Sequence, residues 1–216
     1  MNLEFPDITA TFSPEVIILH SQHPLHILSS AVVGGGLIDT QYIINRHVDK
    51  NYDEPDPVSD LRNFAAKRGI TEPFVGLMTA AYLDGVQTVT LQEDKLTVAA
   101  VATAGLSNPA AAGLSPPAVL GPGTINLILL IAADLSPAAM VNAAITATEA
   151  KTDVLRQYAV RTPEGHLATG TSTDSVVVAG TGGGSPLPYA GPATTVGWLI
   201  GRCVRQSLAA ALANWK

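Results

Sequence analysis

Residues 124–137 read TINLILLIAADLSP, a nearly continuous aliphatic segment followed at once by a serine and a proline. So apolar a run predicts a buried β-strand over Thr124–Ala132. Ser136 and Pro137 then predict a helix start, because a serine side chain caps the free N–H groups of a first turn and proline fits the first helical position. The helix should continue to about Tyr158, so the segment predicts a buried strand joined to a long helix.

Further strands and helices are predicted on both sides of this unit from β-prone runs and turn residues. The N-terminal runs predict antiparallel strands joined by tight turns, one of them at Ser21–Pro24, and Glu93-Asp94 predicts a hairpin turn. Residues 105–123 should form a long loop. We therefore expect one α+β domain over residues 1–216, with a mixed or antiparallel sheet and long helices packed on it. The predicted strands are 9–12, 15–20, 25–30, 42–45, 86–92, 95–102, 124–132, 167–171 and 175–179, and the predicted helices are 58–67, 136–158 and 191–212.

The composition excludes several classes of function. The chain has 216 residues and a formal net charge of -6, which gives no basic surface for nucleic acid. The longest apolar run is about half as long as a membrane span, so no membrane-spanning segment is predicted. The N-terminus has no secretory signal pattern, so a cytoplasmic location is expected. The single cysteine, Cys203, lies in an apolar run and is expected to be a buried packing residue.

Common catalytic motifs do not explain the chain. The glycine triplets at 34–36 and 182–184 lack the spacing of phosphate-binding loops. The histidines at 20, 23, 26, 47 and 166 form no recognisable zinc motif, and no nucleophile elbow occurs. Nucleotide, metal and serine-hydrolase sites are therefore not predicted.

Three polar segments lie where regular elements are expected to begin or end, and together they form the candidate site. They are residues 123–126, 148–152 and 169–174. Their side chains offer carboxylates, hydroxyls, an amide and an ammonium group, which suffice to activate water and stabilise an oxyanion in amide hydrolysis. The alternative is structural, with Glu149 and Lys151 in ordinary ion pairs and Asp174 capping a turn. Helical periodicity places Glu149 and Lys151 on opposite sides, so they should not pair with each other. The candidates are Thr124, Asn126, Glu149, Lys151, Thr171, Thr173 and Asp174.

These segments, taken together, resemble the adenosylcobinamide amidohydrolase family. The most specific matches are Thr148-Glu149-Ala150-Lys151-Thr152 and Thr169-Gly170-Thr171-Ser172-Thr173-Asp174, preceded by Gly123-Thr124-Ile125-Asn126. Collinear matches are also found at Ser29–Ala31, Gly34–Gly36, Asn45–Val48, Asp56–Pro57, Met78–Ala81 and Thr103–Asn108.

The resemblance implies hydrolysis of the amide that joins aminopropanol to a corrin-ring propionate in adenosylcobinamide, giving adenosylcobyric acid and aminopropanol for cobamide salvage. It implies a corrinoid small molecule as partner and no separate cofactor or metal, since the cobalt belongs to the substrate. Glu149 or Asp174 is expected to act as general base on water, with Lys151 or nearby backbone N–H groups, together with Asn126, stabilising the oxyanion. Glycine and polar contacts suit a large ligand with peripheral amides. The expected substrate-binding residues are Gly35, Asn45, Asn108, Thr124, Asn126, Thr171 and Thr173.

Two alternatives remain beside this reading. The chain departs from the family pattern at Ala190–Thr194, where a histidine is missing, and at Trp198, where an acid is common; if these changes disable the chemistry, the protein binds or delivers corrinoids without turnover. An amidase with a threonine nucleophile, Thr124 or Thr171, would instead form a covalent acyl-enzyme. The Ala- and Gly-rich C-terminal helix is compatible with a homodimer.

Overall fold

Strand β8 (Ile125–Ile131) lies inside the main sheet, between two other strands, and its seven residues are all buried. The computed structural model describes residues 2–71, 73–117, 123–184 and 186–215. β8 belongs to an eight-stranded sheet in the order β4-β3-β2-β11-β8-β6-β5, with β1 paired to β2. The other strands of this sheet are β1 (Ile8–Phe12), β2 (Val16–Ser29), β3 (Gly36–His47), β4 (Phe74–Thr79), β5 (Gln87–Glu93), β6 (Leu96–Ala104) and β11 (Ser175–Gly180).

The sheet is mixed, as expected for the α+β class. The pairs β8–β11 and β3–β4 are parallel and the other pairs are antiparallel. Two small two-stranded sheets accompany it, β7 (Pro109–Ala110) with β10 (Gly170–Thr171), and β9 (Asp134–Leu135) with β12 (Pro186–Leu187). The helices are α1 (Pro57–Ala66), α2 (Pro137–Gln157) and α3 (Thr195–Ala213), and a short 3-10 turn lies at Leu83–Gly85.

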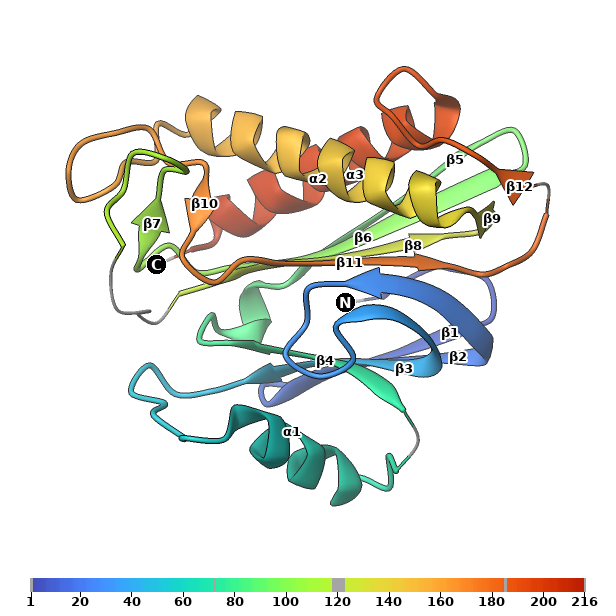
Figure 1. The fold of residues 1–216 in the computed structure, drawn as a ribbon, viewed down its shortest axis with the longest axis horizontal. Coiled ribbons are helices and arrows are strands. Elements are labelled where there is room, and N and C mark those ends of the chain that lie inside the picture. The colour runs from blue at the N-terminus through green and yellow to red at the C-terminus, as the bar shows by residue number, and fades with distance from the viewer. Residues whose placement is uncertain (1, 72, 118–122, 185, 216) are drawn as a thin grey trace.

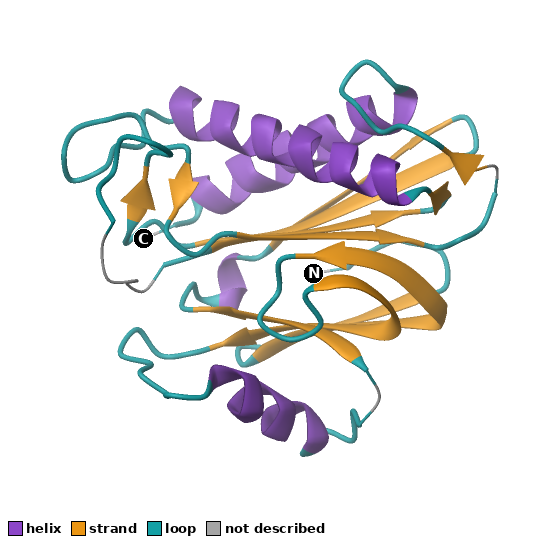
Figure 2. Ribbon diagram, viewed as in Figure 1, coloured by secondary structure: helices purple, strands orange, loops and turns teal. Residues whose placement is uncertain are grey.

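The molecule is built in layers, with two layers of strands between helices. Figure 1 shows α2 and α3 on one side and α1 on the other, and Figure 2 shows the strands stacked between them. Alternation along β8 explains this arrangement, because Leu127 and Leu129 join the core under α2 and α3, while Ile128 and Leu130 join the core between the strand layers. A third cluster packs α1 on β3 and β4.

β2 connects the two strand layers because it bends within its length. Its first part pairs with β1 and its second part with β11, and the pairing with β3 shifts between His20 and Leu25. Pro24 lies in this bulge, where the missing N–H is tolerated. The Gln41 side chain donates to the carbonyl oxygens of Ser21 and Gln22, at 3.1 and 2.9 Å. The predicted tight turn at 21–24 is therefore wrong, because the turn-forming residues make a bulge in one long strand.

Most predicted elements are present, with shifted boundaries. The Ser136 cap of α2 is confirmed, because its side chain accepts from the Ala139 N–H at 3.1 Å. The hairpin turn falls on Asp94-Lys95, one residue later than predicted, and α3 begins at Thr195 rather than near residue 191. Strand β4 was not predicted, and the expected strand at 167–171 is reduced to β10. Part of the predicted loop at 105–123, residues 118–122, lies outside the described residues.

Cys203 is buried, as predicted, and burial raises the pKa of its thiol to about 12. Within the described ranges, no helix is long and apolar enough to cross a membrane.

Candidate active site

The candidate residues meet at one end of the main sheet. β8 and β11 are parallel and both begin there, and the antiparallel neighbour β6 ends there at Ala104. The small β7–β10 pair lies beside these strand ends (Figure 1). Polar residues that flank the strands in the sequence are therefore brought together in space.

A buried ion pair forms the base of this cluster. Lys151 lies on the last part of α2, and its Nζ donates to Asp174 Oδ2, just before β11. Lys151 is only 6% exposed, so both charges are largely shielded from water. Such a pair requires further hydrogen bonds to offset desolvation.

The other oxygen of Asp174 provides these bonds. Asp174 Oδ1 accepts from the Ile125 backbone N–H at 3.1 Å and from the Thr171 hydroxyl. The carboxylate therefore ties together α2, the β10–β11 turn and the first residue of β8. Gly170 lies against the pair, because a Cβ there would fall 2.2 Å from Asp174 Oδ2 and 2.7 Å from Lys151 Nζ.

A second set of hydroxyl contacts lies on the neighbouring residues. Thr173 Oγ1 donates to the Gly123 carbonyl oxygen at 2.7 Å, and it lies 2.7 Å from Thr124 Oγ1. Each hydroxyl carries one proton, so the Thr124 hydroxyl is the donor in the second contact. The result is a chain of hydrogen bonds from Thr124 through Thr173 to the carbonyl of the Gly123–Thr124 peptide bond.

Asn126 and Asn45 join the two strand layers beside the threonines. Asn126 Nδ2 donates to Asn45 Oδ1 at 2.9 Å and to the Met78 carbonyl at 3.0 Å, and Asn45 Nδ2 donates to Thr103 Oγ1 at 3.2 Å. These contacts fix the amide orientation of Asn126. Its Oδ1 is buried without a hydrogen-bond partner, which leaves an unused acceptor in the site.

Two other predicted residues border or miss the cluster. Asn108 borders it, because its Nδ2 donates to Ser172 Oγ at 2.6 Å in the turn before Asp174. Gly35 lies in the loop between β2 and β3, close to the carbonyl oxygens of Ala31 and Ser29, and the structure does not place it in the cluster.

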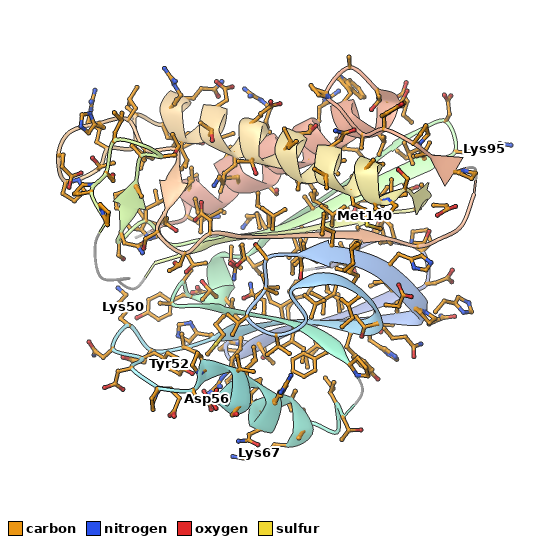
Figure 3. The ribbon with its side chains drawn as sticks, viewed as in Figure 1. Lys50, Tyr52, Asp56, Lys67, Lys95 and Met140 are labelled. Atoms are coloured by element: carbon orange, nitrogen blue, oxygen red, sulfur yellow. The ribbon has the colours of Figure 1, made fainter. Side chains whose placement is uncertain are left out.

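Glu149 also lies away from the cluster. It is exposed on α2 and lines a surface hollow with Trp198 and Arg202. The prediction that Glu149 and Lys151 face opposite sides is confirmed, because Lys151 pairs with Asp174 instead. Trp198 also lies beside Asp94, in the turn between β5 and β6. Figure 3 shows the next residue of that turn, Lys95, at the far end of the molecule from Lys50, which lines the cavity described below.

A cavity of about 340 Å³ adjoins the cluster at Gly123. Its walls include Ala80, Ala81, Gly105 and the exposed aromatic residues Tyr82 and Trp215, which are 67% and 44% exposed. Lys50 also lines it, with its Nζ 5.8 Å from the centre of the Tyr82 ring.

The aromatic residues and Lys50 are not among the site residues predicted from the sequence. Tyr82 follows a short loop and Trp215 follows the end of α3, so no periodic pattern marks them. Among the residues that the structure describes, no group of three or more His, Cys, Asp or Glu side chains is arranged to hold a metal ion.

Comparison with known proteins gives a family match over nearly the whole chain. The family model described as CbiZ, adenosylcobinamide amidohydrolase, matches residues 4–216. A protein of Methanosarcina mazei named adenosylcobinamide amidohydrolase is 34% identical over 192 residues, covering 85% of this chain and 88% of that protein. A Halobacterium salinarum protein with the same name is 40% identical over 126 residues, covering 53% of this chain and 50% of that protein.

A solved structure supports the fold. The crystal structure of the PH0078 protein from Pyrococcus horikoshii OT3 aligns with a TM-score of 0.58 at 12% sequence identity, covering 99% of this chain and 81% of that chain. At this identity the likeness concerns the fold alone.

Proposed function

Because the chain belongs to the adenosylcobinamide amidohydrolase family, we propose that it hydrolyses the amide between aminopropanol and a corrin-ring propionate in adenosylcobinamide, releasing adenosylcobyric acid and aminopropanol. The reaction would return the corrin ring to cobamide synthesis. Amide hydrolysis consumes only water, so the proposal includes no cofactor apart from the cobalt within the substrate.

The observation that carries the proposal is that the Lys151–Asp174 pair and its hydroxyl neighbours belong to a cluster that adjoins an open cavity at Gly123. Amide hydrolysis requires a group that accepts the proton of the attacking oxygen and donors that stabilise the oxyanion. Asp174 supplies the acceptor and Lys151 supplies a shielded positive charge close to it. The threonine hydroxyls lie within hydrogen-bond distance of this pair or of each other.

The cavity suits one arm of a corrinoid better than the whole ring. A corrin ring is too large for about 340 Å³, so we expect the propionate arm and its amide to enter while the ring rests outside. Tyr82 and Trp215 would contact the ring there, because exposed aromatic faces bind flat, largely apolar ligands.

Each predicted residue near the cluster has a role in the proposed reaction. Asp174 and Lys151 are the proposed catalytic pair, and Asn45, Asn108, Thr171 and Thr173 hold or border the substrate site. Glu149 is not included, because it lies in the hollow beside Trp198. The attacking oxygen belongs either to a water activated by Asp174 or to a threonine, and only the second route forms an acyl-enzyme.

Release of aminopropanol from adenosylcobinamide tests the proposed function. Purified protein should release aminopropanol and adenosylcobyric acid in equal amounts over many turnovers, as followed by mass spectrometry. Asp174→Asn should lower the rate by at least about 100-fold. Asp153→Asn is the matched control, because Asp153 lies on α2 and its carboxylate pairs with Arg205 of α3, in an ion pair that is about half exposed. Tight binding of the corrinoid without release would instead identify a corrinoid-binding protein.

A further inference from the structure

The Gly123–Thr124 peptide bond lies within a set of contacts suited to its own cleavage. The Thr173 hydroxyl donates to the Gly123 carbonyl oxygen at 2.7 Å, and it accepts from the Thr124 hydroxyl at 2.7 Å. The carbonyl that would be attacked is therefore polarised, and the neighbouring hydroxyl that would attack it has a path for its proton. Attack of a threonine hydroxyl on the preceding carbonyl closes a five-membered ring, so the nucleophile and the carbonyl belong to adjacent residues.

Both sides of this bond are held in place. Gly123 has φ 118°, a left-handed conformation that favours glycine, and a Cβ there would fall 2.6 Å from Asn108 Oδ1. On the other side, the Thr124 carbonyl accepts from the Gly105 N–H at 3.0 Å, and the Ile125 N–H donates to Asp174. The ion pair therefore positions the backbone that follows the bond.

We propose that the protein cleaves its own chain between Gly123 and Thr124. Thr124 Oγ1 attacks the Gly123 carbonyl carbon, and its proton passes through Thr173 Oγ1 to the carbonyl oxygen. The C–N bond then breaks, the nitrogen takes up that proton, and an ester joins Gly123 to Thr124 Oγ1. Water hydrolyses the ester, which leaves a carboxylate on Gly123 and a free amino group and hydroxyl on Thr124.

The cleaved protein would carry its nucleophile at a new N-terminus. Thr124 is only 7% exposed in the intact chain, and of these two residues only Gly123 lines the cavity. Release of Gly123 would open a path from the cavity to Thr124 Oγ1. The free amino group, with an ordinary pKa of about 8, would then act as the base for that hydroxyl. This assignment of Thr124 as the nucleophile for the corrinoid amide rests on the proposed function, whereas the cleavage itself does not.

Mass spectrometry of the purified, denatured full-length protein tests the cleavage. Two polypeptides are expected, residues 1–123 and 124–216, whose masses sum to the intact mass plus one water. N-terminal sequencing of the second should read TINLI. Thr124→Ala should stay a single chain, and Thr124→Ser should still be cleaved. Thr173→Val should be cleaved at least about tenfold more slowly, because it loses the hydrogen bond to the Gly123 carbonyl and the one from the Thr124 hydroxyl, and with them the path for the proton.

A matched variant and separate readouts make the outcomes distinct. Thr148→Val removes a hydroxyl that bonds only within α2, to the Ala144 carbonyl at 2.8 Å, and it should be cleaved at the native rate. Circular dichroism verifies that Thr124→Ala is folded, and Thr173→Val provides a second test if it is not. An intact native chain, or cleavage that persists in Thr124→Ala, overturns the inference. An intact chain that releases aminopropanol overturns only the cleavage, whereas a cleaved chain that releases none overturns only the proposed function.

Discussion

At the scale of single residues, Asp174 is the centre of the account. One carboxylate contacts Lys151 from α2, the Thr171 hydroxyl and the backbone of Ile125. These three partners come from different elements, so Asp174 both supplies a negative charge and holds these elements in place. Substitutions at the pair should therefore alter both stability and turnover.

Lys151→Met should lower the free energy of unfolding by about 3 kcal/mol, because it leaves the Asp174 carboxylate shielded from water and without its cation. Urea denaturation followed by circular dichroism measures the change. Arg205→Met breaks an ion pair that is about half exposed and should cost under about 1 kcal/mol. Equal losses in the two variants would contradict the view that the Lys151 pair is the shielded one.

Gly170→Ala should disturb the same pair without removing either charge. Its methyl group would lie 2.2 Å from Asp174 Oδ2, so we expect a cost of about 2 kcal/mol and a lower rate of aminopropanol release. Gly201→Ala is the control, because a Cβ there meets open space within α3 and alanine favours a helix. If Gly170→Ala keeps native turnover and stability, then the pair tolerates displacement and its geometry is not essential.

At the scale of elements, helix α2 shows which properties of Glu149 and Lys151 can be predicted from the sequence and which cannot. Its period of 3.6 residues separates Glu149 from Lys151, and this was evident from the sequence. The sequence could not decide which of the two sides faces the site, because both sides carry polar residues. The partner of Lys151 comes from a turn 23 residues later, and only the folded chain brings it there.

Glu149→Gln should therefore leave turnover within about twofold of native, because the side chain is exposed beside Trp198 and lies away from Asp174. Steady-state release of aminopropanol measures this. A loss of 100-fold or more would return Glu149 to the role of general base and would contradict the present assignment.

Strand β2 shows the opposite limit of sequence interpretation. Ser21, Pro24 and their neighbours have the composition of a turn, yet a bulge absorbs them in one continuous strand. The pairing of β2 with β1, β3 and β11 outweighs the turn preference of these residues. Local sequence patterns do not reveal this pairing. The buried strand β8 and the Ser136 cap were predicted correctly, because both depend on local pattern alone.

At the scale of the whole molecule, two strand layers open at one end to form the site. Asn45 and Asn126 bond across the layers there, and the cavity continues outward to Tyr82 and Trp215. The departures near Trp198 lie beside the β5–β6 turn, away from this end. The structure therefore gives these departures no direct contact with the cluster, which weakens the argument for a corrinoid carrier without turnover.

Tyr82→Ala should raise the KM for adenosylcobinamide about tenfold and leave kcat nearly unchanged, because the ring contacts the corrin and not the amide. Tyr189→Ala is the control, since Tyr189 is equally exposed, at 66%, in a surface hollow with Leu96 and Leu187. A fall in kcat at constant KM would contradict the proposed role of Tyr82 in binding the ring.

Hydrolysis in oxygen-18 water tests the central claim most directly. Adenosylcobinamide is incubated with the native protein, and both products are weighed by mass spectrometry. The account predicts one oxygen-18 atom in the new carboxylate of adenosylcobyric acid and none in aminopropanol, because water adds to the carbonyl carbon. Adenosylcobyric acid without oxygen-18, or bound corrinoid with neither product formed, would contradict the claim that this protein hydrolyses the corrinoid amide.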